Sequence, residues 1–307
     1  MYITLSGRLG SGKSTVASRI SNLAGYEIYS TGKIQRGIAE RLNITTLELN
    51  ELMKTKPEYD DIIDRETVRI SKESVGKKIL FDSRLAFHFV EDSLKVYTYV
   101  SPLIAGERVV NDARGAVEHY ESAEEARDGL LERTRVENLR FADIYAIDNL
   151  DYRNYNLIVD STYIDPDQVF EEMKAGMEAY EKDPQMRRIR FSPKSLYPTV
   201  PYEELDQEKV EEYLTMIREG EELPLVKVAG RDFLFYVTEG CEVLAAAQKA
   251  GAAMMGCELD EAFYSTWDSE EKMCSKRIEE REPFDLRILE KNELEKYETE
   301  GVFSYKD

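Results

Sequence analysis

The feature that most constrains the fold of this chain is the segment GRLGSGKS at residues 7–14. It matches the pattern G-x-x-x-x-G-K-[ST], in which backbone amides and a lysine surround phosphate groups. The alternative is a glycine-rich turn that binds nothing, and the flanking sequence distinguishes the two. Residues 2–6 alternate as a short strand, and Val16 and Ile20 begin a helical stripe that Gly25 ends. Because a loop between a strand and a helix directs its amides at one point, we predict a phosphate-binding site.

Composition limits the class of protein further. The chain of 307 residues exceeds the usual size of one domain, so we expect two domains or one with a large appendage. Hydrophobic residues make up 42% and charged residues 33%, which is typical of a globular protein. The net charge of -20 repels other polyanions and argues against nucleic acid as the main partner, although a local basic pocket can still bind one nucleotide.

The N-terminus and the cysteines indicate the compartment. The segment MYITLSG has neither a basic region nor an apolar run that would mark an export signal, so we predict a cytoplasmic protein without membrane insertion. The cysteines, Cys241, Cys257 and Cys274, are odd in number and form no C-x-x-C pair. We therefore expect neither disulfides nor a structural zinc site.

Strands and helices alternate over residues 1–181, which predicts an α/β domain with a parallel sheet flanked by helices. Helices are predicted over 32–42, 58–74 and 104–143. A capping box of Thr45 with Glu48 predicts the start of another helix, and a last helix is predicted to begin at Asp165. Further strands are predicted over 77–82, 94–100 and 155–162.

The segment 182–188 has no periodicity, and we place a domain boundary there. Residues 189–260 predict a smaller α+β domain, with a strand, an amphipathic helix, two strands around a turn at Gly230 and a helix that Gly251 ends. Residues 261–307 form an acidic tail that we expect to be helical.

The loop suggests phosphoryl-transfer chemistry. In such a loop the lysine, here Lys13, reaches the β- and γ-phosphates, and Ser14 offers its hydroxyl to Mg²⁺. Asp82 ends a strand expected beside the first one, where its carboxylate can hold the metal or simply cap a turn. A kinase needs a second group of cations, because the donor and acceptor phosphates repel each other until both are neutralised.

Five segments in order resemble the cytidylate kinases, in particular the compact cytidylate kinase-like branch. They are GRLGSGKST, YSTGKIQRGIAERLNITTLELNELM, ILFDSRLA, ERTRVENLRFADIYAID and YNLIVDSTYIDPDQVFEEM, and the resemblance ends near Met173. It implies a P-loop nucleoside monophosphate kinase that uses ATP with Mg²⁺, with CMP or dCMP as the acceptor. The nucleotide would be held by Gly7, Gly10, Ser11, Gly12, Lys13, Ser14 and Thr15, and the metal by Ser14 and Asp82.

The resemblance also implies the residues that hold the acceptor. Arg36 follows the S-x-G turn and Arg84 lies in the family's D/E-G-R motif, both at the acceptor phosphate. Arg133, Glu137 and Arg140 reproduce the pattern R-x-x-x-[DE]-x-x-R, and their spacing places them on one face of a helix. Glu137 can therefore orient the arginines, and we predict catalytic roles for Lys13, Arg133 and Arg140, with Asp82 and Glu137 also in contact with the substrate site. Arg108 and Arg114 are further candidates on the donor side.

Two positions depart from the family pattern: Lys33 replaces an aspartate and Ser83 replaces a glycine. Lys33 inverts a charge near the acceptor and favours an alternative, a catalytically weak ATP sensor that signals through the C-terminal part. A third possibility is a kinase for a non-nucleotide metabolite.

Residues 189–260 resemble the fold shared by the ParB N-terminal domain and sulfiredoxin. The family's phosphate-binding motif at a helix start reads Gly240-Cys241-Glu242-Val243 here, without its histidine and arginine. We therefore expect Cys241 to be a small apolar residue, and the domain to bind a protein partner, self-associate or regulate the kinase.

Overall fold

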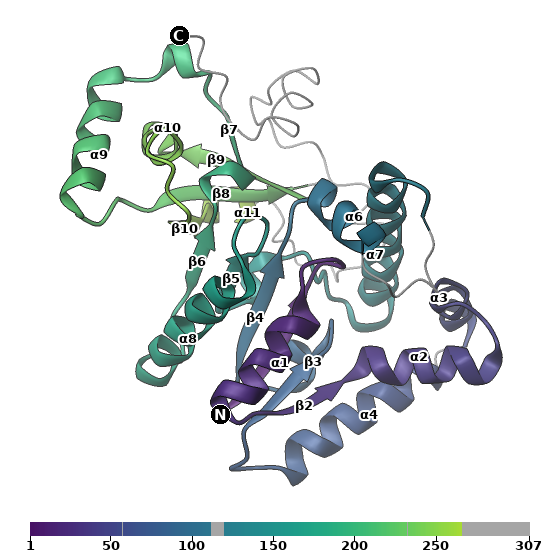
Figure 1. Ribbon diagram of the computed structural model, residues 1–307. Coiled ribbons are helices and arrows are strands. Elements are labelled where there is room, and N and C mark those ends of the chain that lie inside the picture. The colour runs from purple at the N-terminus through teal and green to yellow at the C-terminus, as the bar shows by residue number, and fades with distance from the viewer. Residues whose placement is uncertain (57, 112–119, 232, 266–307) are drawn as a thin grey trace.

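The computed structural model describes residues 1–56, 58–111, 120–231 and 233–265, which form one α/β unit (Figure 1). Within these ranges ten strands form a single sheet in the order β2-β3-β1-β4-β5-β6-β10-β8-β9-β7. The sheet is parallel from β2 to β6, as the alternating pattern predicts. No helix in the described part of the chain is long and apolar enough to cross a membrane.

The strands of the first half are short, and all except the edge strand β2 are mostly buried. They are β1 (Tyr2–Gly7), β2 (Glu27–Ser30), β3 (Ile79–Asp82), β4 (Ser93–Tyr99) and β5 (Leu157–Asp160). In the sheet β1 lies between β3 on one side and β4 on the other. Because the strand order reverses there, a crevice opens at the carboxyl end of β1, where α/β sheets bind their ligands.

The helices follow the sequence predictions closely. They are α1 (Lys13–Ala24), α2 (Thr31–Leu42), α3 (Thr46–Thr55), α4 (Glu58–Glu73), α5 (Ala86–Phe89), α6 (Pro102–Asn111), α7 (Ala123–Tyr145) and α8 (Pro166–Lys182). The capping box at Thr45 is confirmed, and Asp165 caps α8 in the same way. The single helix predicted over 104–143 is wrong, because Ser122 caps a second helix, α7, that starts separately from α6.

The last part of the described chain extends the same sheet. It contains β6 (Arg188–Phe191), β7 (Leu196–Pro198), α9 (Gln207–Glu219), β8 (Val226–Arg231), β9 (Leu234–Glu239), α10 (Cys241–Lys249), β10 (Met255–Leu259) and α11 (Glu261–Ser265). Short 3-10 turns cover Tyr152–Asn154, Pro193–Ser195 and Tyr202–Glu204. Gly230 lies inside β8 rather than in the predicted turn, and β10 was not predicted. Most of the predicted acidic tail lies outside the described residues.

The two parts of the chain share a hydrophobic core. One buried cluster runs from Phe87 and Tyr99 in the first half to Phe191, Phe235 and Tyr264 in the last part. β6 pairs with β5, so the sheet continues through the segment where we place a domain boundary. The division into domains therefore stays a prediction. The two parts share one sheet and one hydrophobic core.

Candidate active site

The loop between β1 and α1 has the backbone that its glycines allow. A Cβ on Gly7 would lie 2.3 Å from Thr98 Oγ1, so only glycine lets β1 end against β4. Gly12 has φ 74° at the N-cap of α1, a left-handed conformation that costs glycine little. The loop therefore ends at a helix N-terminus whose free amides favour an anion.

Lys13 begins α1 and its side chain turns back over the loop. Its Nζ donates hydrogen bonds to the carbonyl oxygens of Gly7 at 2.8 Å and Arg8 at 2.6 Å. Burial, and next the positive charge of Arg84, lower the pKa of Lys13 to about 7. The ammonium group is thus short of negative charge, which the phosphates of a nucleotide would supply.

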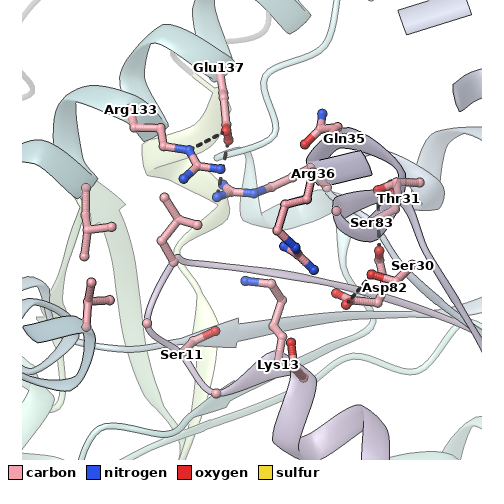
Figure 2. Close-up of a pocket in the computed structure, with 18 of the residues that line it drawn as sticks. Ser11, Lys13, Ser30, Thr31, Gln35, Arg36, Asp82, Ser83, Arg133 and Glu137 are labelled. Atoms are coloured by element: carbon pink, nitrogen blue, oxygen red, sulfur yellow. Dashed lines mark hydrogen bonds and ion pairs between the residues drawn. The ribbon is translucent and has the colours of Figure 1, made fainter. Parts of the chain in front are cut away.

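A cavity of about 700 Å³ opens above this loop, a size typical of small-molecule sites. Its walls include nearly all of the predicted site residues: Gly10, Ser11, Gly12, Lys13, Ser14, Thr15, Arg36, Asp82, Arg84, Arg133 and Glu137. Figure 2 shows Lys13, Arg36 and Arg133 pointing into the same space from different elements. Gly7 does not line the cavity, but its carbonyl holds Lys13.

Glu137 on α7 organises the arginines of one wall. Its Oε1 accepts a hydrogen bond from Arg133 Nε at 3.1 Å, and its Oε2 lies 3.3 Å from Arg84 Nη2. Glu137 is 4% exposed, and burial alone would raise its pKa. The charges of Arg84, Arg133 and Arg140 outweigh this effect, so the pKa of Glu137 is lowered and the carboxylate stays ionised. Glu137 therefore contacts Arg133, its neighbour in the helical spacing, and Arg84 from the loop after β3, whereas the spacing predicts Arg140 as the second arginine.

Arg140 is placed differently from the sequence prediction. It is not among the described residues that line the cavity, and its Nη1 lies 3.4 Å from Asp60 Oδ2 on α4. Both side chains are buried. In this structure Arg140 therefore holds a wall residue, and its catalytic role stays a prediction.

Asp60 and Asp64 form an acidic wall that the sequence analysis missed. Both line the cavity from α4, with Ile63 between them. Tyr145 donates a hydrogen bond to Asp64 Oδ2 at 2.5 Å. Burial raises the pKa of Asp64 to about 6 despite this bond. The signal was the i, i+4 spacing of two aspartates, but acidic residues in a first helical turn ordinarily serve the helix dipole.

The remaining predicted residues have varied positions. Arg36 is exposed at the cavity rim, and no ion pair links it to another described residue, so its charge is available. Lys33 is exposed and does not line the cavity, whereas Ser83 does. Arg108 lines the cavity and donates to the carbonyl oxygen of Ser161 at 2.6 Å. Arg114 lies outside the described residues.

Ser14 and Asp82, the predicted ligands of a metal ion, both line the cavity. Asp82 pairs with Leu5 in the sheet, so its carboxylate emerges beside the loop, and Ser30 Oγ donates to its Oδ2 at 3.0 Å. The described residues contain no cluster of three or more carboxylate, cysteine or histidine ligands. Mg²⁺ does not need one, because it keeps water and phosphate oxygens as ligands beside one or two protein groups. Ser30 and Gln35 also line the cavity and were not predicted.

The fold and the loop define an α/β protein of the P-loop class. A family model described as the cytidylate kinase-like family matches residues 2–163, and the chain belongs to this family. It is 33% identical to a cytidylate kinase of Natronomonas pharaonis over 187 residues, which is 60% of this chain and 92% of the relative. A cytidylate kinase of Halobacterium salinarum is also 33% identical, over 60% of this chain and 92% of its own length.

The C-terminal part has much weaker similarity to known structures. A sulfiredoxin from Arabidopsis thaliana covers 27% of this chain and 98% of its own, at 21% identity and a TM-score of 0.22. That score is too low to support the predicted ParB or sulfiredoxin resemblance, which stays a prediction. Cys241 is buried, and burial raises the pKa of its thiol, as expected for a small apolar residue at this position.

Proposed function

We propose that this protein transfers the γ-phosphoryl group of ATP to a nucleoside monophosphate, with CMP or dCMP as the acceptor. The observation that carries the proposal is the convergence of cations from distant segments on one cavity. Lys13, Arg36, Arg84 and Arg133 come from four different elements or loops and line the same space. Since the donor and acceptor phosphates repel each other, a site that joins them needs such a group of cations.

The reaction needs no covalent intermediate. An oxygen of the acceptor phosphate attacks the γ-phosphorus in line, the bond to the β,γ-bridging oxygen breaks, and ADP leaves. Lys13 and Arg133 stabilise the charge that spreads over the transferred group, and Glu137 keeps Arg133 in place. Mg²⁺, held by Ser14 and Asp82, would neutralise donor phosphate charge when bound.

The acidic wall favours an acceptor whose nucleobase carries an exocyclic amino group. Asp60 and Asp64 offer carboxylate oxygens, which accept hydrogen bonds from an amino group such as N4 of cytosine. Uracil presents a carbonyl oxygen at the corresponding position, and two acceptors facing each other are unfavourable. The wall therefore supports CMP over UMP as the acceptor.

A second candidate is the nucleotide sensor, in which ATP binding signals through the C-terminal part. Lys33, the sequence feature that favours it, is exposed and lies outside the cavity walls. A contact between the two parts favours the sensor instead: Arg8 of the phosphate-binding loop donates a hydrogen bond to the carbonyl oxygen of Phe233 in the C-terminal part. Turnover that depends on an acceptor distinguishes the kinase from the sensor.

The test is a coupled assay of ADP release with ATP and each nucleoside monophosphate in turn. We expect CMP or dCMP to give the highest kcat/KM, and Lys13→Ala to lower it at least about a thousandfold. Arg36→Ala should raise the acceptor KM about tenfold to a hundredfold, since a charge-assisted contact to phosphate is lost.

Lys33→Ala is the matched control for Arg36→Ala, because Lys33 lies on the same helix but outside the cavity walls. It should leave the acceptor KM within about twofold of the wild-type value. ADP release at the same rate with and without every monophosphate, or full turnover by Lys13→Ala, would contradict the proposed function.

A further inference from the structure

The phosphate-binding loop touches the C-terminal part through the side chain of Arg8. This side chain is 4% exposed, and its guanidinium carbon lies 4.9 Å from the ring centre of Tyr99 and 5.0 Å from that of Phe233. Arg8 Nη1 donates to the carbonyl oxygen of Val100 at 2.9 Å, and Nη2 donates to the carbonyl oxygen of Phe233. Two aromatic faces and two carbonyl oxygens thus hold one cation.

The strands that flank Phe233 pack on the first half of the chain. Phe233 directly precedes β9 and has φ 72°, a left-handed conformation. A Cβ on Gly230 would lie 2.3 Å from the Tyr152 ring, so this ring packs directly on the β8 backbone. The ring of Phe235 lies 4.5 Å from that of Tyr152 and 4.4 Å from that of Phe191. These contacts therefore hold β8 and β9, on either side of Phe233, against the core.

The backbone of Arg8 connects this contact to the reacting groups. Its carbonyl oxygen accepts hydrogen bonds from Lys13 Nζ at 2.6 Å and from Ser11 Oγ at 2.8 Å. The contacts run from Phe233 to Arg8 and from Arg8 to Lys13 with no residue in between. Neither Arg8 nor Phe233 is among the described residues that line the cavity, so any effect on ATP passes through the shape of the loop.

We propose that Phe233 is a positioning residue for the phosphate-binding loop. Its ring and carbonyl oxygen hold Arg8, and Arg8 in turn holds Lys13 and Ser11 where the donor phosphates bind. The C-terminal part then completes the ATP site by reducing the freedom that the loop would lose on binding. This inference rests on the proposed nucleotide site.

The test is the ATP dissociation constant of the full chain, measured by calorimetry without an acceptor. Phe233→Gly removes the ring and suits φ 72°, so backbone strain does not explain a loss. We expect Phe233→Gly and Arg8→Leu each to weaken ATP binding about tenfold. The double variant should be no weaker than Arg8→Leu, because both changes break the same contact. The acceptor KM at saturating ATP should change less than about twofold, a split that general destabilisation does not produce.

Glu239→Gln is the matched control, since Glu239 lies at the far end of β9 and pairs with Lys227. It should bind ATP as the wild type does. If Phe233→Gly fails to fold, Phe233→Leu keeps an apolar side chain without the aromatic face, and it should still weaken ATP binding by several fold. Wild-type affinity in the folded Phe233 variants, or losses that multiply in the double variant, would overturn the positioning role.

Lys13→Ala in the same assay separates the two proposals. If Lys13→Ala binds ATP normally, the nucleotide site itself is assigned wrongly. If Lys13→Ala loses ATP binding while the Phe233 variants keep it, only the positioning role fails.

Discussion

Residues 1–182 and residues 188–265 contribute strands to one sheet, but the two parts bury different kinds of side chain. Among the described residues of the first part, the buried charged side chains are Arg8, Asp60, Glu137, Arg140, Asp148 and Asp160. Among the described residues of the second part, the buried polar side chains are the neutral Ser192, Ser195 and Thr199. Buried charges are costly unless paired, so their concentration in the first part is what we expect if the proposed active site lies there.

Among the variants that test the buried charges of the first part, Glu137→Gln should have the largest effect on kcat and on stability. Without its charge, Arg84 and Arg133 lose their shared partner in a buried site. We expect kcat to fall about a hundredfold and the free energy of unfolding to fall by about 3 kcal/mol. Steady-state kinetics and urea unfolding measure both.

Glu132→Gln is the matched control, because Glu132 lies on the same helix in an exposed pair with Arg135. It should change the free energy of unfolding by less than about 0.5 kcal/mol. Equal effects of the two variants would show that burial of charge in the first part has no functional meaning.

Asp64→Asn tests the acidic wall. The amide can donate a hydrogen bond to the carbonyl oxygen of uracil, so the ratio of kcat/KM for CMP to that for UMP should fall about tenfold. Competition assays with both acceptors measure this ratio. Asp61→Asn, on the exposed side of α4 beside Arg65, should leave it unchanged. A ratio that stays constant in Asp64→Asn would remove the argument for CMP.

The pH dependence of ATP binding tests Lys13. In the empty site its pKa is about 7, and bound phosphates should raise it toward its ordinary value of 10.5. ATP binding above pH 7 then takes up a proton, and affinity should fall about fivefold between pH 7 and pH 8. Calorimetry in two buffers of different ionisation enthalpy counts the proton. Lys13→Arg should show no uptake, since guanidinium stays protonated, and equal uptake in both proteins would contradict this assignment.

Cys241→Ala should have the smallest effect on turnover. It tests whether the second part carries chemistry of its own. Its thiol is buried and its pKa is raised, so we expect it to be a poor nucleophile. ADP release should change less than about twofold, which the same coupled assay measures. A large loss of turnover in a folded Cys241→Ala variant would show that the second part carries chemistry of its own.

The sequence predicts the first part well because its signals are local. The glycine loop, the capping box at Thr45, the helix start at Asp165, and the spacing of Arg133 and Glu137 each fit within one turn or one helix. Arg140 follows the same spacing, yet it contacts Asp60. Helical periodicity fixes the face on which a residue lies but not the neighbour that this face meets.

The contacts between distant segments were not predictable from the sequence. Arg8 occupies a variable position of the loop pattern, where an exposed side chain is the ordinary expectation. Its burial depends on the turn at Phe233, more than two hundred residues later in the chain. The joining of β6 to β5 was missed for a related reason, because the aperiodic segment 182–188 reads as a linker although its last residue, Arg188, pairs with Leu157 in the sheet.

The most direct test of the central claim is the affinity of a bisubstrate analogue, adenosine and cytidine joined through five phosphates, measured by calorimetry. If the cations that line the cavity hold the donor and acceptor phosphates together, the analogue should bind at least about a hundredfold more tightly than ATP, and Arg84→Met should abolish most of that gain. An analogue that binds no more tightly than ATP would contradict the account.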